Sequence, residues 1–166
     1  MKSESRILTI YFFSLIGIVA WLGIVLLAPY LKSNNSGWSA LFYAVFSPIC
    51  HQIPSRSFFL FGYPLAVCGR CFGIYSGFFI GALFYPFLKG LSNTTLPRAK
   101  TFIFLSLPIV LDTFGNFLRL WMTPNIPRFI IGFLWGLILP FYFIPGIIEL
   151  FLSIGQLKKK FDGKTS

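Results

Sequence analysis

The chain has 166 residues, of which 56% are hydrophobic and only 11% are charged, whereas ordinary soluble domains carry about 25% charged residues. This composition excludes a soluble domain, because so few charges cannot cover the apolar surface of so short a chain. The net charge of +10 does not indicate a nucleic-acid partner, since the basic residues separate apolar runs instead of forming one solvent-exposed patch. We interpret them as topology signals and as contacts with the headgroups of membrane lipids.

Four apolar segments have about the length needed to cross a bilayer. The first carries no charge over residues 7–31, and at about 1.5 Å per residue it exceeds the ~30 Å hydrocarbon core. It is too long for the apolar part of a signal peptide, so we predict an uncleaved first span. The other spans are predicted over residues 71–88, 101–121 and 129–154. Pro140 and Pro145 are expected to kink the last one.

The sequence therefore predicts an all-α integral membrane protein, a four-transmembrane-helix bundle formed by a single membrane domain over residues 1–166. The loop between the first two spans, residues 32–70, contains an apolar stretch over residues 37–49 with large side chains at helical spacing. These thirteen residues are too few to cross the bilayer. We predict an interfacial or re-entrant helix here.

The basic residues also predict the orientation of the bundle. With four spans, nine of the fourteen lysines and arginines share one side: Lys2, Arg6, Lys89, Arg98, Lys100, Lys158, Lys159, Lys160 and Lys164. The positive-inside rule makes this side cytoplasmic. Both termini are then cytoplasmic in a plasma-membrane protein, and the loop over residues 32–70 faces outward. The tail over residues 158–166 is expected to be solvated and flexible.

Small residues recur at a spacing of four in two of the predicted spans. Gly73, Gly77 and Gly81 form a stripe on the second span, and Gly132 and Gly136 form one on the fourth. Such stripes let helix backbones approach closely in a membrane. We therefore expect these two helices to lie inside the bundle, and the stripes also permit a homo-oligomer.

All three cysteines and the only histidine fall within 22 residues of the outer loop and the start of the second span. Cys68 and Cys71 form a Cys-x-x-Cys pair, whose tight turn aims both sulfurs at one point. Cys50 and His51 would complete a tetrahedral set of three sulfurs and one nitrogen, which suits a transition metal and zinc in particular. Adjacent side chains normally point apart, which weighs against Cys50 and His51 both being ligands.

The same residues support two other interpretations. A Cys-x-x-Cys pair at a helix N-terminus, with Arg70 between the sulfurs, should have a lowered thiol pKa, as in a membrane thiol-disulfide oxidoreductase. The outer side of a plasma membrane is oxidising, so the cysteines can instead form a plain structural disulfide. A non-enzymatic membrane subunit is the third functional hypothesis, and the sequence leaves open whether the protein is an enzyme.

A polar stripe interrupts the third predicted span, where Asp112, Asn116 and Arg119 recur at helical spacing. A carboxylate at the centre of a membrane helix costs roughly 2.5–3.5 kcal/mol, so it should face the protein interior and have a partner. One interpretation is a buried ion pair, with Arg119 or Arg128, that fixes the third span to the fourth. The other is a functional acid in an anion-binding pocket.

Four arginines are expected near the outer interface beside this stripe: Arg56, Arg70, Arg119 and Arg128. Guanidinium groups bind phosphate or carboxylate through two hydrogen bonds. Together with Asn116 they are candidates for binding an anionic lipid headgroup, a lipid phosphate or a quinone-like ligand. If the site is catalytic, Arg128 would hold the anion and Asp112 would act as acid, base or orienting group.

Three short runs carry a resemblance to a known family: Cys50-His51-Gln52, Arg56-Ser57-Phe58 and Cys68-Gly69-Arg70-Cys71-Phe72-Gly73-Ile74-Tyr75-Ser76-Gly77. They are similar to the signature of small prokaryotic membrane proteins grouped as domain of unknown function 2085. The resemblance extends more loosely to Asp112, Arg128, Gly132 and Gly136. It implies a cysteine cluster beside a helix bundle, and it brings no established activity. This chain departs from the family pattern at Thr113 and Asn116, where the pattern usually has Gly and Gln.

Overall fold

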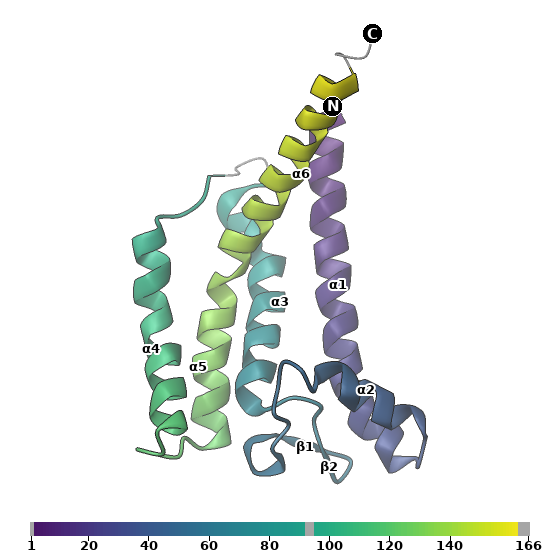
Figure 1. Ribbon diagram of the computed structural model, residues 1–166, viewed down its shortest axis with the longest axis vertical. Coiled ribbons are helices and arrows are strands. Elements are labelled where there is room, and N and C mark those ends of the chain that lie inside the picture. The colour runs from purple at the N-terminus through teal and green to yellow at the C-terminus, as the bar shows by residue number, and fades with distance from the viewer. Residues whose placement is uncertain (1, 92–94, 163–166) are drawn as a thin grey trace.

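The computed structural model describes residues 2–91 and 95–162, and most of them are helical (Figure 1). The helices are α1 (Lys2–Ser33), α2 (Trp38–Phe46), α3 (Gly69–Lys89), α4 (Ala99–Phe117), α5 (Asn125–Ile138) and α6 (Pro140–Asp162). Between α2 and α3 lie the 3-10 turn η1 (Pro54–Arg56) and two antiparallel strands, β1 (Phe59–Leu60) and β2 (Tyr63–Pro64). The predicted helical architecture is confirmed.

The long helices run alternately in opposite directions. The start of α1 and the end of α6 lie at one end of the molecule, and α2 and the small sheet lie at the other (Figure 1). Within the described residues, three helical segments are long and apolar enough to cross a membrane: Ile7–Ser33, Gly69–Lys89 and Asn125–Phe151. They coincide with three of the four predicted spans. α4 is not among them, because Lys100 and Asp112 lower its hydropathy.

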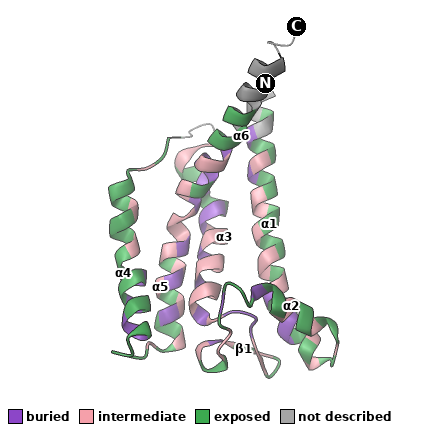
Figure 2. Cartoon of the chain, in the orientation of Figure 1, coloured by how far each residue is buried: buried purple, intermediate pink, exposed green. Residues whose placement is uncertain are grey.

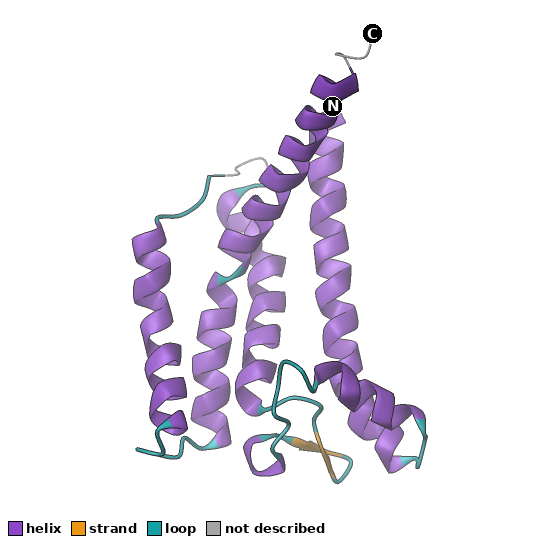
Figure 3. Cartoon of the chain, viewed as in Figure 1, coloured by secondary structure: helices purple, strands orange, loops and turns teal. Residues whose placement is uncertain are grey.

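The last predicted span is a helix in two parts. α5 ends at Ile138 and α6 begins at Pro140, and the helix axis turns between them (Figure 3). Proline has no N–H to donate to the carbonyl four residues earlier, and its ring crowds that carbonyl. The kink predicted at Pro140 is thus confirmed, as a break between two helices, whereas Pro145 lies inside the continuous helix α6. The tail predicted as flexible from residue 158 is helical as far as residue 162, and residues 163–166 lie outside the described part.

α3 and α5 pack backbone against backbone. A Cβ atom added to Gly77 would lie 2.2 Å from the carbonyl oxygen of Phe133, and one added to Gly132 would lie 2.3 Å from that of Arg70. The same closeness occurs at Gly73, Gly81 and Gly136. Only glycine permits this approach, so the two predicted stripes meet within one chain. A homo-oligomer stays a prediction.

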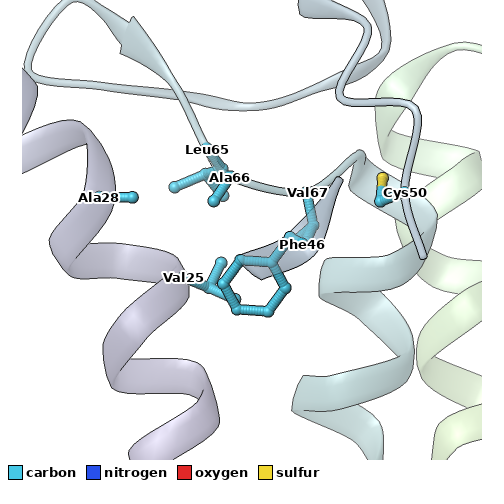
Figure 4. Packing of buried hydrophobic residues seen from close by; sticks show 7 residues of the cluster. All are labelled: Val25, Ala28, Phe46, Cys50, Leu65, Ala66 and Val67. Atoms are coloured by element: carbon cyan, nitrogen blue, oxygen red, sulfur yellow. The ribbon is translucent and has the colours of Figure 1, made fainter. Parts of the chain in front are cut away.

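α1 contacts the rest of the bundle through two apolar clusters near its ends. Near its start, Tyr11 packs against α3 and α6 and donates a 3.1 Å hydrogen bond to the carbonyl of Ala82. Near its end, Val25 packs with Phe46 of α2 and with the buried segment 65–67 (Figure 4). These two clusters fix α1 at both ends.

α2 is the helix predicted in the outer loop. Phe46 is fully buried, but Trp38 is 67% and Leu41 54% exposed. Figure 2 shows both buried and exposed residues along α2. Nine residues are too few to cross a bilayer, and an exposed apolar face on such a helix is typical of one lying in the membrane interface. That location stays a prediction.

The rest of the loop between α1 and α3 contains a small hairpin that the sequence did not predict. Phe61 and Gly62 both have positive φ, 53° and 80°, which is the conformation of a two-residue type I′ turn. The Lys32 ammonium lies 5.2 Å from the ring centroid of Tyr43 and 5.4 Å from that of Tyr63. Tyr43 also donates a hydrogen bond to the carbonyl of Pro64, and burial raises its pKa. These contacts join the hairpin to α1 and α2.

Candidate metal and anion site

Cys50 is placed by the turn that ends α2. Its N–H donates a 2.9 Å hydrogen bond to the carbonyl of Phe46, and the residue is only 5% exposed. Figure 4 shows Cys50 at the edge of the apolar cluster around Phe46. The packing of α2 against α1 therefore holds this sulfur near the start of α3.

Cys68 and Cys71 lie at the start of α3. The three residues before Cys68 are buried, and Cys68 itself is the extended residue that precedes the helix. Its N–H donates a 3.1 Å hydrogen bond to the sulfur of Cys50. The three thiols are free, and their sulfurs all lie within 4.8 Å of one another. Two sulfurs bound to one tetrahedral zinc ion lie roughly 3.8 Å apart, so the cluster has about the size of a metal site.

Electrostatics favour a thiolate in this cluster. Hydrogen bonds from the thiols of Cys50 and then Cys71 lower the pKa of the Cys68 thiol below its usual range. The partial positive charge at the N-terminus of α3 acts in the same direction. The thiolate is the form that binds a metal or attacks a disulfide. The lowered pKa therefore favours both metal binding and thiol-disulfide exchange at this cluster.

His51 is exposed and lies outside the group formed by the three sulfurs. It does line the same cavity as they do. The structure thus brings together three of the four predicted ligands. His51 as the fourth ligand stays a prediction.

A cavity of about 310 Å³ adjoins the sulfurs. Besides the three cysteines, its polar lining consists of His51, Gln52, Arg56, Arg70, Thr113, Asn116 and Arg128. A second cavity of about 350 Å³ shares Arg56 and Arg128 with the first and also contacts Ser55, Thr123 and Asn125. Three of the four arginines predicted to bind an anion therefore surround one space beside the thiols.

A chain of polar contacts joins α3, α4 and α5. Asp112 forms an ion pair with Arg70 and accepts a 3.1 Å hydrogen bond from the side chain of Asn116. Asn116 in turn accepts a 2.9 Å hydrogen bond from Arg128. The Thr123 hydroxyl also donates to Asp112, a contact that the sequence analysis missed. Asp112, Asn116 and Arg128 are all buried.

The partner of Asp112 differs from the prediction. We expected an ion pair between the third and fourth spans, but the pair joins α4 to Arg70 of α3, and α5 is reached through Asn116. Asp112 is not among the residues that line the cavity. This favours the ion-pair interpretation, in which Asp112 positions Arg70.

Arg119 departs from the predicted stripe. α4 ends at Phe117, and Arg119 has a φ of 58°. The N–H of Leu120 donates a 2.9 Å hydrogen bond to the carbonyl of Gly115, and the N–H of Arg119 donates a 3.4 Å hydrogen bond to the carbonyl of Asn116. This pattern is a Schellman motif, which ends a helix with one left-handed residue. Arg119 is therefore exposed, and it lies outside the residues that line either cavity.

Comparison with known proteins places these features in a wider group. The family described as "Predicted membrane protein (DUF2085)" matches residues 50–142. An uncharacterized protein of Methanocaldococcus jannaschii is 39% identical over 146 residues, which are 84% of this chain and 94% of that protein. An uncharacterized protein of Methanothermobacter thermautotrophicus is 34% identical over 87 residues, 52% of this chain and 77% of that protein. No solved structure matches the chain.

Proposed function

The chain belongs to the DUF2085 family of predicted membrane proteins. For this protein we propose that the three cysteines bind a transition metal, zinc. We propose also that the arginines beside them form a pocket for an anionic ligand. The observation that carries this proposal is the meeting of three sulfurs within 4.8 Å in the wall of a cavity that three arginines also line.

The donor set fits zinc. Thiolates are soft ligands and zinc accepts them in tetrahedral geometry, whereas magnesium and calcium require oxygen ligands. The N–H of Cys68 donates a hydrogen bond to the Cys50 sulfur, a contact that orients a metal-binding sulfur. Three sulfurs leave a fourth position, which His51 or a ligand in the cavity can supply. Zinc sites that bind a substrate keep such an open position, whereas structural zinc sites have four protein ligands.

The charges around the cavity favour an anion. Three thiolates with one divalent ion carry a single negative charge, and Asp112 carries another. Arg56, Arg70 and Arg128 therefore leave one positive charge unbalanced. Within the described residues, the Nε atoms of Arg70 and Arg128 are also buried without a hydrogen-bond partner. A buried donor left this way costs about 1–3 kcal/mol, which supports a ligand rich in oxygen, such as the headgroup of an anionic lipid.

We also propose that α4 is a fourth span and that both termini are cytoplasmic. α4 lies beside α5, and Trp135 of α5 donates a 2.9 Å hydrogen bond to the Ser106 hydroxyl of α4 (Figure 1). The polar groups of α4 that would be costly in lipid are those that bond to α3 and α5. With four spans, the excess of basic residues lies at the end away from the cysteines, so the site faces the outside of the plasma membrane.

Metal analysis of the purified protein tests the proposal. In detergent without chelators, we expect roughly one zinc ion per chain, since one set of ligands holds one ion. Cys50→Ser, Cys68→Ser and Cys71→Ser should each remove most of the metal, whereas Ser47→Ala, an exposed change near the cluster, should not. His51→Ala separates the two versions of the site, because it lowers the zinc content only if the imidazole is a ligand.

A different result would favour the thiol-disulfide oxidoreductase. That hypothesis is supported by the Cys-x-x-Cys pair at the start of α3 and by Cys50 beside it. Protein that holds no transition metal, and whose intact mass rises by about two hydrogens on reduction, would contain a disulfide. Such protein would overturn the metal proposal. Recovery of the oxidised form with an added quinone would then identify a redox enzyme.

Charged thiol reagents test the anion pocket. In metal-free protein, the anionic 2-sulfonatoethyl methanethiosulfonate should modify the cysteines faster than its trimethylammonium analogue. One arginine near the pocket contributes about 1 kcal/mol for each reagent, with opposite signs, so Arg56→Gln should reduce this preference roughly thirtyfold. Arg119→Gln removes an equal charge outside both cavities and should leave it unchanged. Equal effects of the two variants would show that only the overall charge matters.

A further inference from the structure

An apolar groove of about 830 Å³ runs along the middle of α1, on the side that faces α3 and the α5–α6 span. Its walls include Gly17 and Trp21 of α1, Tyr75 and Phe78 of α3, and Phe143 of α6. All of these residues belong to segments long and apolar enough to cross a membrane. The groove is therefore open to the hydrocarbon region of the bilayer and is separate from the cysteine site.

The groove follows from how α1 is held. The clusters around Tyr11 and Val25 fix its two ends against the bundle. Between them, a Cβ atom added to Gly17 would meet nothing within 4 Å. The break before Pro140 turns α6 toward the start of α1 (Figure 1), and the groove is lined by residues of α1, α3 and α6. The two ends are thus closed and the middle is open.

Such a space needs an occupant. An empty apolar void loses the dispersion contacts of the atoms that line it, and water does not occupy a site without polar partners. The groove extends along α1 from Thr9 to Trp21, roughly 18 Å at about 1.5 Å per residue, and an apolar cluster lies near each end. A transmembrane helix of ~30 Å therefore does not fit lengthwise within it. We propose that the groove binds a hydrocarbon chain of a membrane lipid.

The outer end of the groove connects this chain to the cysteine site. The rings of Trp21 and Tyr75 meet edge to face with centroids 5.9 Å apart, and Trp21 packs in the same way on Phe46 at 4.8 Å. Trp21 and Tyr75 both pack against the apolar cluster that contains Cys50. A lipid chain in the groove therefore supports the wall that holds this sulfur. Its binding does not require a metal, so this inference stands apart from the proposed function.

Spin-labelled lipid tests the groove directly. We reconstitute the purified protein into phosphatidylcholine nanodiscs that contain a trace of phosphatidylcholine with a nitroxide on its acyl chain. Electron paramagnetic resonance should show an immobilised fraction for the unmodified protein. Gly17→Leu places a side chain inside the groove and should reduce that fraction by the share of one lipid per chain, because lipids along the other exposed apolar faces remain. Gly17→Ala should reduce it less.

Gly23→Leu is the matched control. Gly23 lies on the same helix, a Cβ there also meets nothing within 4 Å, and it is not a groove residue. This variant should keep the immobilised fraction, and the helical circular dichroism of both leucine variants should match that of the unmodified protein. An equal immobilised fraction in Gly17→Leu and the unmodified protein would overturn the proposal. A loss in Gly17→Leu accompanied by conversion of a dimer to a monomer would also overturn it, because the groove would then hold a second copy.

Discussion

Asp112→Ala is expected to lower the stability of the detergent-solubilised protein by about 3–5 kcal/mol, the usual cost of removing one partner of a buried ion pair. Asp112 is 7% exposed, and its carboxylate accepts contacts from Arg70, Asn116 and Thr123. Without it, the half-buried Arg70 and the buried Arg128 have no acidic partner among the residues described here. The loss corresponds to a fall of roughly 6–20 °C in the unfolding midpoint, measured by near-UV circular dichroism.

Two further variants isolate the charge. Glu149→Ala also removes a carboxylate, but Glu149 is exposed. The stability of this variant should therefore change by no more than about 0.5 kcal/mol. The double variant Arg70→Met with Asp112→Leu replaces both charges by apolar groups and should recover most of the stability. If Asp112→Ala behaves like Glu149→Ala, the ion pair does not hold α3 and α4 together.

Gly77→Ala should also destabilise the protein strongly, although it adds only one methyl group. The new Cβ atom would lie 2.2 Å from the carbonyl oxygen of Phe133 and 3.0 Å from the nitrogen of Leu137. Both are backbone atoms, so α3 and α5 must move apart. Overpacking of this kind typically costs about 1–3 kcal/mol, or roughly 2–12 °C in the unfolding midpoint.

Gly146→Ala is the control for this change. Gly146 lies in α6, in the same membrane-capable segment as the partner of Gly77, and an added Cβ meets nothing within 4 Å. Alanine has the higher helix propensity, so this variant should keep or slightly raise the midpoint. A Gly77→Ala midpoint equal to that of Gly146→Ala would mean that the two helices do not pack as described.

The spacing of small and apolar residues predicted much of this fold. The apolar runs located α1, α3 and the α5–α6 span, and Pro140 located the break in the last one. The glycine stripes indicated which helices lie inside the bundle. They could not indicate that the stripes face each other within one chain, because periodicity identifies the small face of a helix and not its neighbour.

For the candidate site, the sequence predicted the cysteine cluster but not the partner of Asp112 or the position of Arg119. The nearness of Cys50 to Cys68 and Cys71 was predicted from the ligand types gathered in one 22-residue stretch. The length of the stretch could not establish it, because such a segment can extend over roughly 70 Å. The choice of Arg70 as the partner of Asp112 required the three-dimensional arrangement. Arg119 was misplaced because helical spacing was extended past Phe117, where an arginine occupies the left-handed position that usually favours glycine.

The pair between Arg70 and Asp112 also bears on how the protein is made. The two residues are 42 positions apart, so at about 5–20 residues per second Arg70 leaves the ribosome roughly 2–8 s before its counter-ion. During that interval α3 enters the membrane with its guanidinium at the interface, where the long side chain can reach water. Arg70 can leave the interface and pair with Asp112 only after α4 has been synthesised. The order of synthesis thus makes completion of the pocket one of the last events in assembly.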